Sequence, residues 1–490
     1  MIDLGQVIKI AEKQSDDKKC IVTLQKNEHY FIKKTIYICR NMQIEGNGAV
    51  IQNETDLGLL IASSDVKISN LKICGGGISI RIDNRGKTIK NIVVQNCEMK
   101  DYAFSGLVIG ASEGNGMTQN ILVKDCVIWT EPLKKEDGTD CVVALDVLLT
   151  AGFSDKKNLE NTLLKDVVID HCSIKGHSIC NIMSVPGLSA NPDSTPVFKN
   201  CRIEDISVTN SKLIGSDDTV IAAQANYINN ESCYCQNFIV CNNEIEFGLT
   251  GLSASAGSPM TGKVEKIFFR EIKFINNKMH GRKNVGETRT AIGIGAGGIN
   301  YKPTSCNKSG IENVEIKGNT IIECERGITV SAGYSMIDAD APSELRENYV
   351  RNIIIKSNYL KDVQNCFMFY AAWIEGRRFD WNWGVHHTTQ TWLPPVENHQ
   401  NKTVVVKGNY IENLICEENS CDGFSYLLCA AAVMARGHGL VTENKIKKNF
   451  VFRKNKHCNG EEHVAIRDVI LEDWVTDGGN NTLEQSNIQI

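Results

Sequence analysis

The chain repeats one short phrase, which reads apolar, any, apolar, any, any, small polar, any, apolar. Copies occur at Val314–Ile321 (VEIKGNTI), Ile353–Leu360 (IIIKSNYL) and Val404–Ile411 (VVVKGNYI). The alternating apolar residues are typical of a strand that buries one side. Self-similarity along a chain is typical of stacked repeats, in which each unit packs on its neighbours. We therefore predict one long solenoid rather than several globular domains.

The sixth position of the phrase changes from cysteine to asparagine along the chain. Its residues are Asn47, Leu71, Cys97, Cys126, Cys172, Ser211, Asn243, Asn277, Asn319, Asn358, Asn409 and Asn444, with Cys201 as an alternative to Ser211. The steps range from 24 residues (47 to 71) to 51 residues (358 to 409), as expected for coils with inserted loops. Stacked asparagine amides can hydrogen-bond one another, and cysteine is small and apolar enough for the same position. We predict a single buried column.

A second apolar segment follows the phrase in each coil and is rich in Ala, Gly and Ser. Examples are Thr219–Ala225 (TVIAAQA), Gly251–Gly257 (GLSASAG) and Ala291–Gly298 (AIGIGAGG). Small residues on an exposed strand let a ligand approach the backbone. These segments are therefore our candidate for the floor of a binding groove, although small residues can also serve the turn that follows.

The repeat and its asparagine column resemble the right-handed parallel β-helix of the pectin-lyase-like superfamily, over about residues 35–455. The resemblance implies an all-β fold, a single-stranded right-handed parallel β-helix solenoid. Near-helical spacing of the apolar residues within Ile2–Gln14 adds a short N-terminal helical cap. We expect a cap over 1–20, the β-helix over 21–458 with an inserted loop at about 373–402, and a C-terminal cap or oligomer contact over 459–490. Most members of the superfamily cut, epimerise or bind polysaccharides, but a fold does not by itself give a function.

Composition narrows the classes of partner. A net charge of −5 disfavours a nucleic-acid binder, which would show a basic stripe. Met1–Leu4 leads directly into charged residues, and the longest apolar run is too short for a bilayer, so we expect a cytoplasmic protein with no membrane partner. The 19 cysteines suggest reduced thiols. We expect no metal site and no cofactor, with Ca²⁺ considered only for a lyase.

The segment Ile214–Ala222 (IGSDDTVIA) carries the sharpest catalytic signal. It resembles the GDDCIAI-type segment of the polygalacturonase family of glycoside hydrolases, which implies that Asp217 and Asp218 are paired catalytic carboxylates. Gly138–Asp140 (GTD) resembles that family's NTD segment. The family's GHG-type segment is missing, since Gly248–Gly251 reads GLTG, and of its RIK-type segment only Arg289 remains.

Glycoside cleavage needs one carboxyl that is protonated and one that is ionised, and two close carboxyls supply both states. The alternative is a pair of Asp residues that cap a turn. His177, one coil earlier, is a candidate general base or sugar ligand, or else a hydrogen-bonded turn residue. Asp140 and Glu287 are candidates for the second carboxylate.

Two arginines near these candidate carboxylates suggest an anionic substrate as an option. Arg289 and Arg326 could hold a carboxylated sugar through two parallel hydrogen bonds. The alternative is a salt bridge between these arginines and the neighbouring Glu287 or Glu325.

The segment Trp373–Trp392 contains four of the six tryptophans of the chain. Long insertions in compact folds are usually functional, and aromatic rings can stack on sugar faces. We predict sugar contacts for the members of this segment that carry rings or charges: Trp373, Arg377, Asp380, Trp381, Trp383 and Trp392. The alternatives are a loop that packs on itself and a subunit interface.

Together these features predict a carbohydrate-active enzyme that cleaves a glycosidic bond in an oligosaccharide. One alternative is a polysaccharide lyase, a uronate epimerase, or a fructan-type transferase that forms or opens a cyclic disaccharide. Another is a non-catalytic carbohydrate-binding adhesin or tailspike-like protein. The expected partner is an oligosaccharide, and a homo-oligomer, trimer or dimer, is the only protein assembly we consider.

Overall fold

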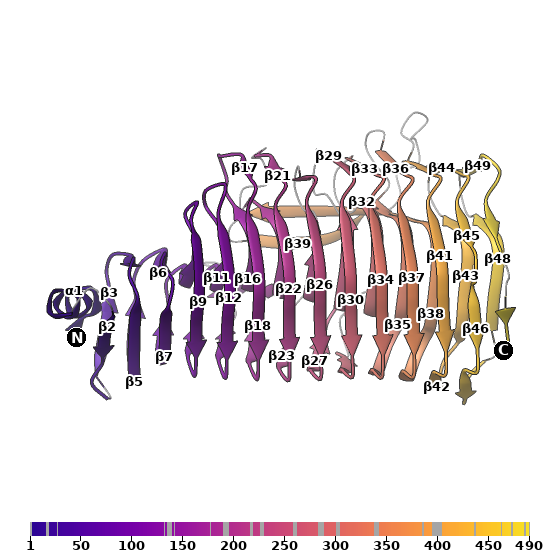
Figure 1. Ribbon diagram of the computed structural model, residues 1–490. Helices are drawn as coiled ribbons and strands as arrows, with labels where there is room; N and C mark the ends of the chain where they lie inside the picture. Colours follow the sequence, from indigo (N-terminus) through magenta and orange to yellow (C-terminus); the bar gives the residue numbers. More distant parts are fainter. Residues whose placement is uncertain are drawn as a thin grey trace.

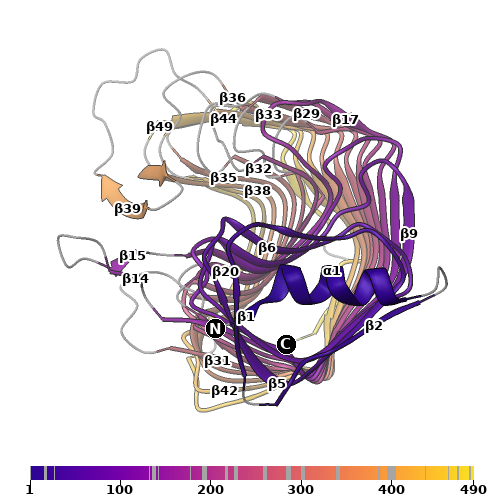
Figure 2. The ribbon, with the colours of Figure 1, turned by 90° about the vertical axis from the view of Figure 1, so that its left-hand side faces the viewer.

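The protein is a right-handed parallel β-helix (Figure 1). Seen from the N-terminal end, successive strands pass clockwise as the chain recedes (Figure 2). The computed structural model describes residues 2–489 except 16–18, 27, 132, 135–139, 142, 177, 190–195, 216–218, 226–229, 258–261, 283–288, 300–303, 338–342, 385–386, 394–403, 436–437, 462, 472–473 and 485–486. For some strand residues, 140 and 375–384 among them, only the backbone is described.

Four strand positions in each coil stack into four faces, which we name A to D in chain order. Face A consists of β9 (Thr88–Gln95), β12 (Met117–Lys124), β18 (Leu163–Asp170), β22 (Arg202–Thr209), β26 (Tyr234–Cys241), β30 (Phe268–Ile275), β34 (Gly310–Lys317), β37 (Tyr349–Lys356) and β41 (Tyr410–Glu417). Face B consists of β10 (Glu98–Lys100), β13 (Val127–Thr130), β19 (Ser173–Gly176), β23 (Lys212–Ile214), β27 (Glu244–Phe247), β31 (Lys278–Gly281), β42 (Ser420–Asp422) and β47 (Lys456–Cys458).

Face C consists of β8 (Ile78–Ile82), β11 (Ser105–Ile109), β16 (Val143–Phe153), β20 (Ser178–Leu188), β24 (Thr219–Gln224), β28 (Thr250–Gly257), β32 (Thr290–Ile299), β43 (Tyr426–Ala435) and β48 (His463–Leu471). Two long strands, β35 (Thr320–Ile337) and β38 (Tyr359–Gly384), run through faces B and C without a break. Face D consists of β17 (Leu159–Glu160), β21 (Phe198–Lys199), β25 (Asn230–Glu231), β29 (Gly262–Glu265), β33 (Thr304–Asn307), β36 (Ser343–Arg346), β40 (Val404–Lys407), β44 (His438–Thr442) and β49 (Trp474–Asp477).

The N-terminal end is covered by a short helix, as predicted. The first coils contain β1 (Ile2–Asp3), α1 (Leu4–Gln14), β2 (Cys20–Thr23), β3 (His29–Ile32), β4 (Ile36–Ile38), β5 (Met42–Asn53), β6 (Leu57–Ile61) and β7 (Val66–Cys74). Asp3 caps α1 by accepting hydrogen bonds from the backbone N–H groups of Gly5 and Gln6. The helix buries Leu4 and Ile8 against the first coil and so covers an edge that could otherwise pair with another chain (Figure 2).

The C-terminal segment continues the same ladders. Strands β45 (Lys445–Lys447) and β46 (Val451–Arg453) pair with β41, and β50 (Thr482–Leu483) and β51 (Asn487–Ile488) pair with them in turn. The role of residues 459–490 as a cap or an oligomer contact stays a prediction. Among the described residues, no helix is long and apolar enough to cross a membrane.

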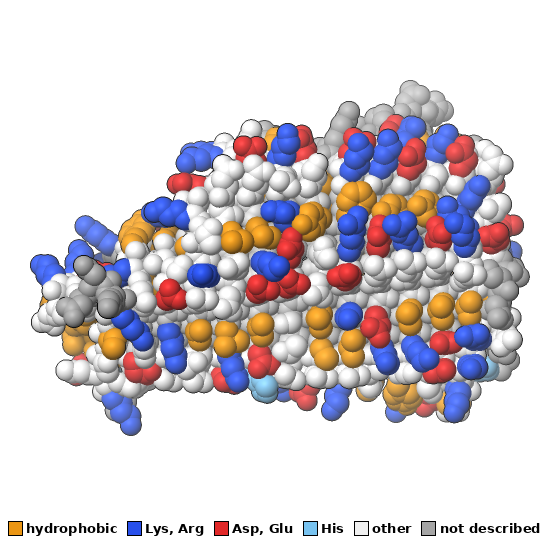
Figure 3. Space-filling model, in the orientation of Figure 1, with side chains coloured by type: hydrophobic (Ala, Val, Ile, Leu, Met, Phe, Trp, Pro, Cys, Tyr) orange, Lys and Arg blue, Asp and Glu red, His pale blue; other side chains and the backbone are white. Residues whose placement is uncertain are grey.

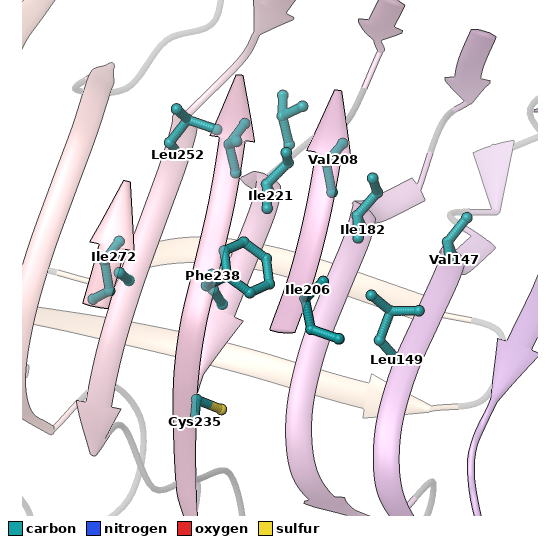
Figure 4. Close-up of a cluster of buried hydrophobic side chains, with 14 of the residues drawn as sticks. Val147, Leu149, Ile182, Ile206, Val208, Ile221, Cys235, Phe238, Leu252 and Ile272 are labelled. Carbon is teal, nitrogen blue, oxygen red and sulfur yellow. The ribbon is translucent and has the colours of Figure 1, made fainter. Parts of the chain in front are cut away.

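Inward-facing aliphatic and aromatic side chains fill the interior in columns that run along the helix axis. In Figure 4, Val147, Ile182, Ile221 and Leu252 come from successive strands of face C and meet side chains from face A such as Phe238. Each is at most 1% exposed, because a residue at the same place in the next coil covers it. Outward-facing side chains of face A include charged residues of both signs, with rows of apolar side chains beside them (Figure 3). Glu312, for example, accepts a hydrogen bond from Arg351 at 2.8 Å.

Buried asparagines form a ladder at the corner between faces A and B. The ladder runs through Ser211, Asn243, Asn277, Asn319, Asn358, Asn419 and Asn455. Each rung from Asn243 onward repeats one pattern: the Oδ1 of Asn319 accepts from both the backbone N–H and the Nδ2 of Asn277 at 3.0 Å. The residue before each rung has a positive φ, 55° at Asn276, so a tight turn places the amide inward.

The prediction of a single column was wrong at both of its ends. Asn409 and Asn444 belong to a second ladder at the corner between faces D and A, which runs through Ser309, Asn348, Asn409, Asn444 and Asn481. At the N-terminal end, Ala49 and not Asn47 pairs with Leu71. Both corners use the same turn and the same buried amide, so the local phrase is alike in two different places.

We expect Asn319→Ala to lower the free energy of unfolding by about 2–4 kcal/mol, because the buried backbone N–H of Asn277 and the carbonyl of Phe274 both lose their partner. Urea titration followed by circular dichroism measures this loss. The matched control is Thr320→Ala, at the next position on the outer side, which should stay within about 0.5 kcal/mol of the wild type. Equal losses in the two variants would contradict a structural role for the ladder.

Candidate active site

Three of the four residues predicted to be catalytic fall in segments that connect face B to face C, and the fourth, Asp140, is on β15 (Asp140–Cys141). His177 falls between β19 and β20, whereas Asp217 and Asp218 fall between β23 and β24, and all three lie outside the described residues. Their neighbours are paired in register, Lys175 with Ile214 and Cys180 with Thr219. The two segments therefore connect the same two faces in adjacent coils, although they are about 40 residues apart in the sequence.

Two glycines let these coils approach closely at the corner. Gly215 has a φ of +92°, and a Cβ at this position would lie 2.8 Å from the carbonyl oxygen of Gly176. Any other residue at 215 would be strained and would also clash with the neighbouring coil. Glycine at this position therefore fixes how the chain enters residues 216–218.

A buried carboxylate supports this corner from the interior. Asp146, on β16, is fully buried and accepts hydrogen bonds from Tyr102 Oη, from Ser178 Oγ at 2.7 Å and from Asn181 Nδ2 at 2.6 Å. Burial raises the pKa of Tyr102 well above its ordinary value, and the charge of Asp146 raises it further. The cluster ties three successive coils together where the predicted catalytic segments begin.

The sequence patterns predicted no role for Asp146. Tyr102, Ser178 and Asn181 were missed altogether. A polar residue at an inward position of an apolar strand could have indicated this cluster, because a buried polar side chain requires a hydrogen-bond partner.

Arg289 and Glu325 form an ion pair further along the same corner. Arg289 donates through Nε at 2.9 Å and Nη2 at 2.8 Å to the two carboxylate oxygens, and its backbone N–H donates to Glu325 at 2.7 Å. Desolvation alone would raise the pKa of Glu325, but the bonds from Arg289 outweigh it and hold the pKa below its ordinary value. Pairing with Glu325 was the alternative that the sequence left open for Arg289.

Arg326 and Trp373 lie next to that pair on the outer side of face C. The guanidinium of Arg326 is 4.6 Å from the centre of the Trp373 ring, which also contacts Tyr334 and Tyr370 with ring centres 5.0 and 5.2 Å away. Trp373 is 6% exposed, so its ring packs within the protein rather than forming an open platform.

The rest of the tryptophan-rich segment forms a β-hairpin. The end of β38 pairs antiparallel with β39 (His387–Leu393), and Trp381 is opposite Gln390. The hairpin extends along the stack on the side of face C, where a second hairpin, β14 (Leu133–Lys134) with β15 (Asp140–Cys141), also projects (Figures 1 and 2). The side chains of Asp140, Arg377, Asp380, Trp381, Trp383 and Trp392 and the whole of Glu287 lie outside the described residues.

The outer side of face C is not uniformly lined by small residues, so the predicted groove floor is wrong for the end coils. The N-terminal coils carry a buried apolar cluster that includes Val108, Leu148, Met183 and Val185. The C-terminal coils carry a second cluster of Met368, Tyr370, Trp373, Cys429 and Ala431. Many of the small residues counted in the sequence, such as Ala254, face the interior instead.

Small and polar residues occupy the outer side between these clusters. We call this patch the polar window: Ser253, Ser255, Gly293, Gly295, Thr329 and Ser331. The first four are half-buried. A Cβ added to Gly293 or Gly295 would have its nearest neighbouring atom 3.6 Å away, so the backbone is open to contact at both positions.

Several polar groups in and beside the window have no hydrogen-bond partner among the described residues, whereas Thr329 Oγ1 donates to the Ile292 carbonyl at 3.4 Å. The hydroxyls of Ser253, Ser255 and Ser331 make no hydrogen bond within the described part of the chain, and Ser331 is only 6% exposed. Gln224 pairs with Ser255 in the adjacent coil, and its buried Oε1 accepts no hydrogen bond from any described residue. A buried acceptor such as this Oε1 is costly to leave without a ligand or water that satisfies it.

The described part of the chain offers no candidate metal site beside the window. No group of three or more His, Cys, Asp or Glu residues there could hold a metal ion. A groove of about 380 Å³ lies elsewhere, at the corner between faces A and B of the early coils, where Asn70, Lys72 and Glu98 line it.

Comparisons with known proteins give remote similarities to solved structures. No family model and no curated protein sequence matches the chain. Among solved structures, it is similar to PfbA, a surface adhesin of Streptococcus pneumoniae, with a TM-score of 0.33 and 10% identity over 86% of this chain and 87% of that one. It is also similar to the A-module of the Azotobacter vinelandii mannuronan C-5 epimerase AlgE4, with a TM-score of 0.24 and 9% identity over 97% and 95% of the two chains. At such identities the likeness concerns the fold alone.

We expect Glu325→Gln to lower the free energy of unfolding by about 1–2 kcal/mol at pH 7, because Arg289 loses a charged partner that binds it twice. Since folding lowers the pKa of Glu325, its contribution is present above the ordinary pKa of a glutamate and is lost as the pH falls below about 4. Urea titrations at pH 7 and pH 3 should therefore show the variant and the wild type converging in acid. The control is Glu315→Gln on face A. If the Glu325→Gln variant and the wild type still differ in free energy of unfolding at pH 3, the account is contradicted.

Proposed function

We propose that this protein is a carbohydrate-active enzyme that hydrolyses a glycosidic bond in an oligosaccharide bound beside the corner between faces B and C. The observation that carries the proposal is the polar window, where hydroxyls without partners among the described residues lie beside open glycine backbone. Sugar hydroxyls both donate and accept hydrogen bonds, and Ser and Thr hydroxyls match them in both respects. The window begins one coil after the strand that follows Asp217 and Asp218.

In the proposed reaction, one carboxyl of the Asp217 and Asp218 pair protonates the glycosidic oxygen as the bond to the anomeric carbon breaks. The other takes a proton from a water molecule, whose oxygen bonds to the anomeric carbon. One water is consumed, and each product ends in a hydroxyl. His177, in the preceding coil, would assist as a base or a sugar ligand, and Asp140 remains a candidate second carboxylate.

The ion pair at this corner favours hydrolysis over elimination. A lyase or epimerase would use Arg289 or Arg326 as the base that abstracts a proton next to the sugar carboxylate. Arg289 donates to both oxygens of Glu325, and a guanidinium bound in this way holds its proton more tightly, as its raised pKa indicates. Arg326 stacks on Trp373, which favours a packing role.

We expect Asp217→Asn and Asp218→Asn each to lower kcat by about 100-fold or more while oligosaccharide binding is retained, because the amide can neither donate nor accept the required proton. A screen of oligosaccharides read by product mass finds the substrate and shows whether water is added. Isothermal titration calorimetry then compares binding by the wild type and the variants.

Other outcomes would identify the alternatives. Products without added water and with a new double bond indicate a lyase, and products without added water and without a double bond indicate a transferase. A substrate whose configuration changes at unchanged mass indicates an epimerase. Binding with no turnover in any form of the protein would contradict an enzyme and favour a binding protein.

A further inference from the structure

Face A carries a row of outward-facing side chains that is mostly apolar toward both ends and charged in the middle. Val168 is 36% exposed and Ile354 is 43% exposed. In Figure 3 the row appears as orange side chains interrupted by one blue and one red side chain. Single exposed aliphatic side chains are common on protein surfaces, but a continuous row of them indicates an interaction surface. From strand to strand the row runs through Val93, Leu122, Val168, Ser207, Ile239, Lys273, Glu315, Ile354, Ile415 and Val451.

A second row on the same face is aromatic. Tyr234, Phe268, Gly310, Tyr349 and Tyr410 occupy equivalent outer positions in successive strands. The ring of Tyr349 leans over Gly310, since a Cβ at Gly310 would lie 2.2 Å from that ring. The rings of Tyr349 and Tyr410 have centres 5.4 Å apart. The four aromatic residues are half-buried, so they extend the apolar surface beside the first row.

The charges in the middle of face A are arranged in a way that is complementary to itself. Lys273 on β30 lies beside Glu315 on β34, and neither makes an ion pair within the described part of the chain. Between the two rows, Arg270 on β30 lies beside Glu312 on β34. Both pairs therefore have the basic residue on β30 and the acidic residue on β34. A half-turn about an axis midway between these strands places each base opposite an acid.

We propose that face A is the contact surface of a homodimer, in which two copies of the chain pack face to face with antiparallel helix axes. The two-fold axis runs along the strand direction, midway between β30 and β34. Each outer row then faces the same row of the second copy in reverse order. This inference goes beyond the proposed function and does not depend on it.

Apolar side chains meet one another in this arrangement. Ile239 of one copy faces Ile354 of the other, and Val168 faces Val451. The exposed parts of these side chains are removed from water together, which supplies the driving force for association. Opposite charges meet at the centre, where Lys273 faces Glu315.

Charge complementarity selects the antiparallel orientation. If the helix axes were parallel, a two-fold axis along the first row would place Lys273 opposite Lys273 and Glu315 opposite Glu315. Like charges that face each other suppress an arrangement, whereas opposite charges fix its register. With antiparallel axes, Arg270 also faces Glu312, so four charge contacts near the axis are favourable.

Two contacts further from the axis bring like charges together. Glu204 faces Glu412, and Lys165 faces Lys447. Both glutamates already have a partner within the monomer, because Lys165 lies 3.6 Å from Glu204 and Lys448 lies 2.8 Å from Glu412. These internal pairs reduce the repulsion, and the complementary charges at the centre decide the register.

The shared area is large enough for a stable dimer. The overlap runs from β12 to β51, which are nine strand steps apart. At about 4.8 Å per step, and about 3.3 Å for each of the eight residues of a strand such as β12, it measures roughly 43 Å by 26 Å, or about 1,100 Å² per copy. A stable interface buries about 800 Å² on each partner. The strands stay nearly parallel along the stack, so two such faces can lie flat on each other (Figure 1).

The first test measures the mass of the wild-type protein in solution by sedimentation velocity over a range of concentrations. A particle of twice the mass of the chain is expected, and it should dissociate into monomers on dilution. A wild type that remains monomeric at every concentration, or that forms a trimer, would overturn the inference.

The second test reverses charges on face A. Lys273→Glu and Glu315→Lys should each raise the dimer Kd by about tenfold or more, because like charges then face each other twice across the axis. An equal mixture of the two variants should regain the dimer, since two acidic residues of one copy then face two basic residues of the other. The control is Lys278→Glu, an exposed lysine on face B, which should keep the wild-type Kd. Equal Kd values for the Lys273 and Lys278 variants would overturn the inference.

Thermal unfolding shows whether these variants fold. Lys273 and Glu315 have no ion pair with another described residue, so each substitution should leave the melting temperature of the monomer close to that of the wild type.

The third test fixes the orientation by cross-linking with a short bismaleimide. A mixture of the Ile239→Cys and Ile354→Cys variants should give a covalent dimer, because these positions face each other across the antiparallel contact. The Ile239→Cys variant alone should not exceed the background of the wild type, in which Cys39 and Cys458 are exposed. A covalent dimer from Ile239→Cys alone, or none above background from the mixture, would overturn the antiparallel contact.

Discussion

In-register parallel pairing between successive coils is the constraint on which the rest of the structure depends. Each strand pairs with the strand one coil before and one coil after, so the corners of all coils must coincide along the axis. A backbone that turns sharply at every coil leaves buried amide and carbonyl groups at the corner. The asparagine ladders satisfy those groups, since each side chain both accepts from the next coil and donates to a backbone carbonyl, as Asn243 does to Val208 at 2.9 Å.

The same constraint leaves the lengths of the loops free to vary. Adjacent rungs are 32 residues apart between Ser211 and Asn243 but 61 apart between Asn358 and Asn419, and the rungs are alike in both places. Function can therefore be placed in insertions and on outer faces without disturbing the core. The corner between faces B and C shows this division: Asp146 and its donors tie the coils together inside, while the polar window faces outward beside it.

The fold was predictable because its signal is local and repeated. Asn243, Asn277 and Asn319 occupy the same place in the phrase, and one rule covers them. The split into two ladders was not predictable from the phrase, because Asn358 and Asn409 follow the same turn at different corners. Partners across coils, such as Glu325 for Arg289, could be offered only as alternatives, since the number of residues per coil varies.

The candidate site was predictable in outline and not in detail. The small residues of face C suggested contact with a ligand, but alternation sends Ala254 inward and Ser255 outward, and the sequence does not show which coils are covered by packed side chains. Tyr102 and Ser331 carried no signal of their own. Their roles follow from what lies in the neighbouring coil, which is a property of register rather than of local sequence.

The most direct measurement is a crystal structure of the Asp217→Asn variant with a bound linear oligosaccharide. The account predicts sugar density over Ser255, Gly295 and Ser331, with one glycosidic bond beside the turn between Gly215 and Thr219. Sugar density on another face of the β-helix, with the polar window filled by water, would contradict it.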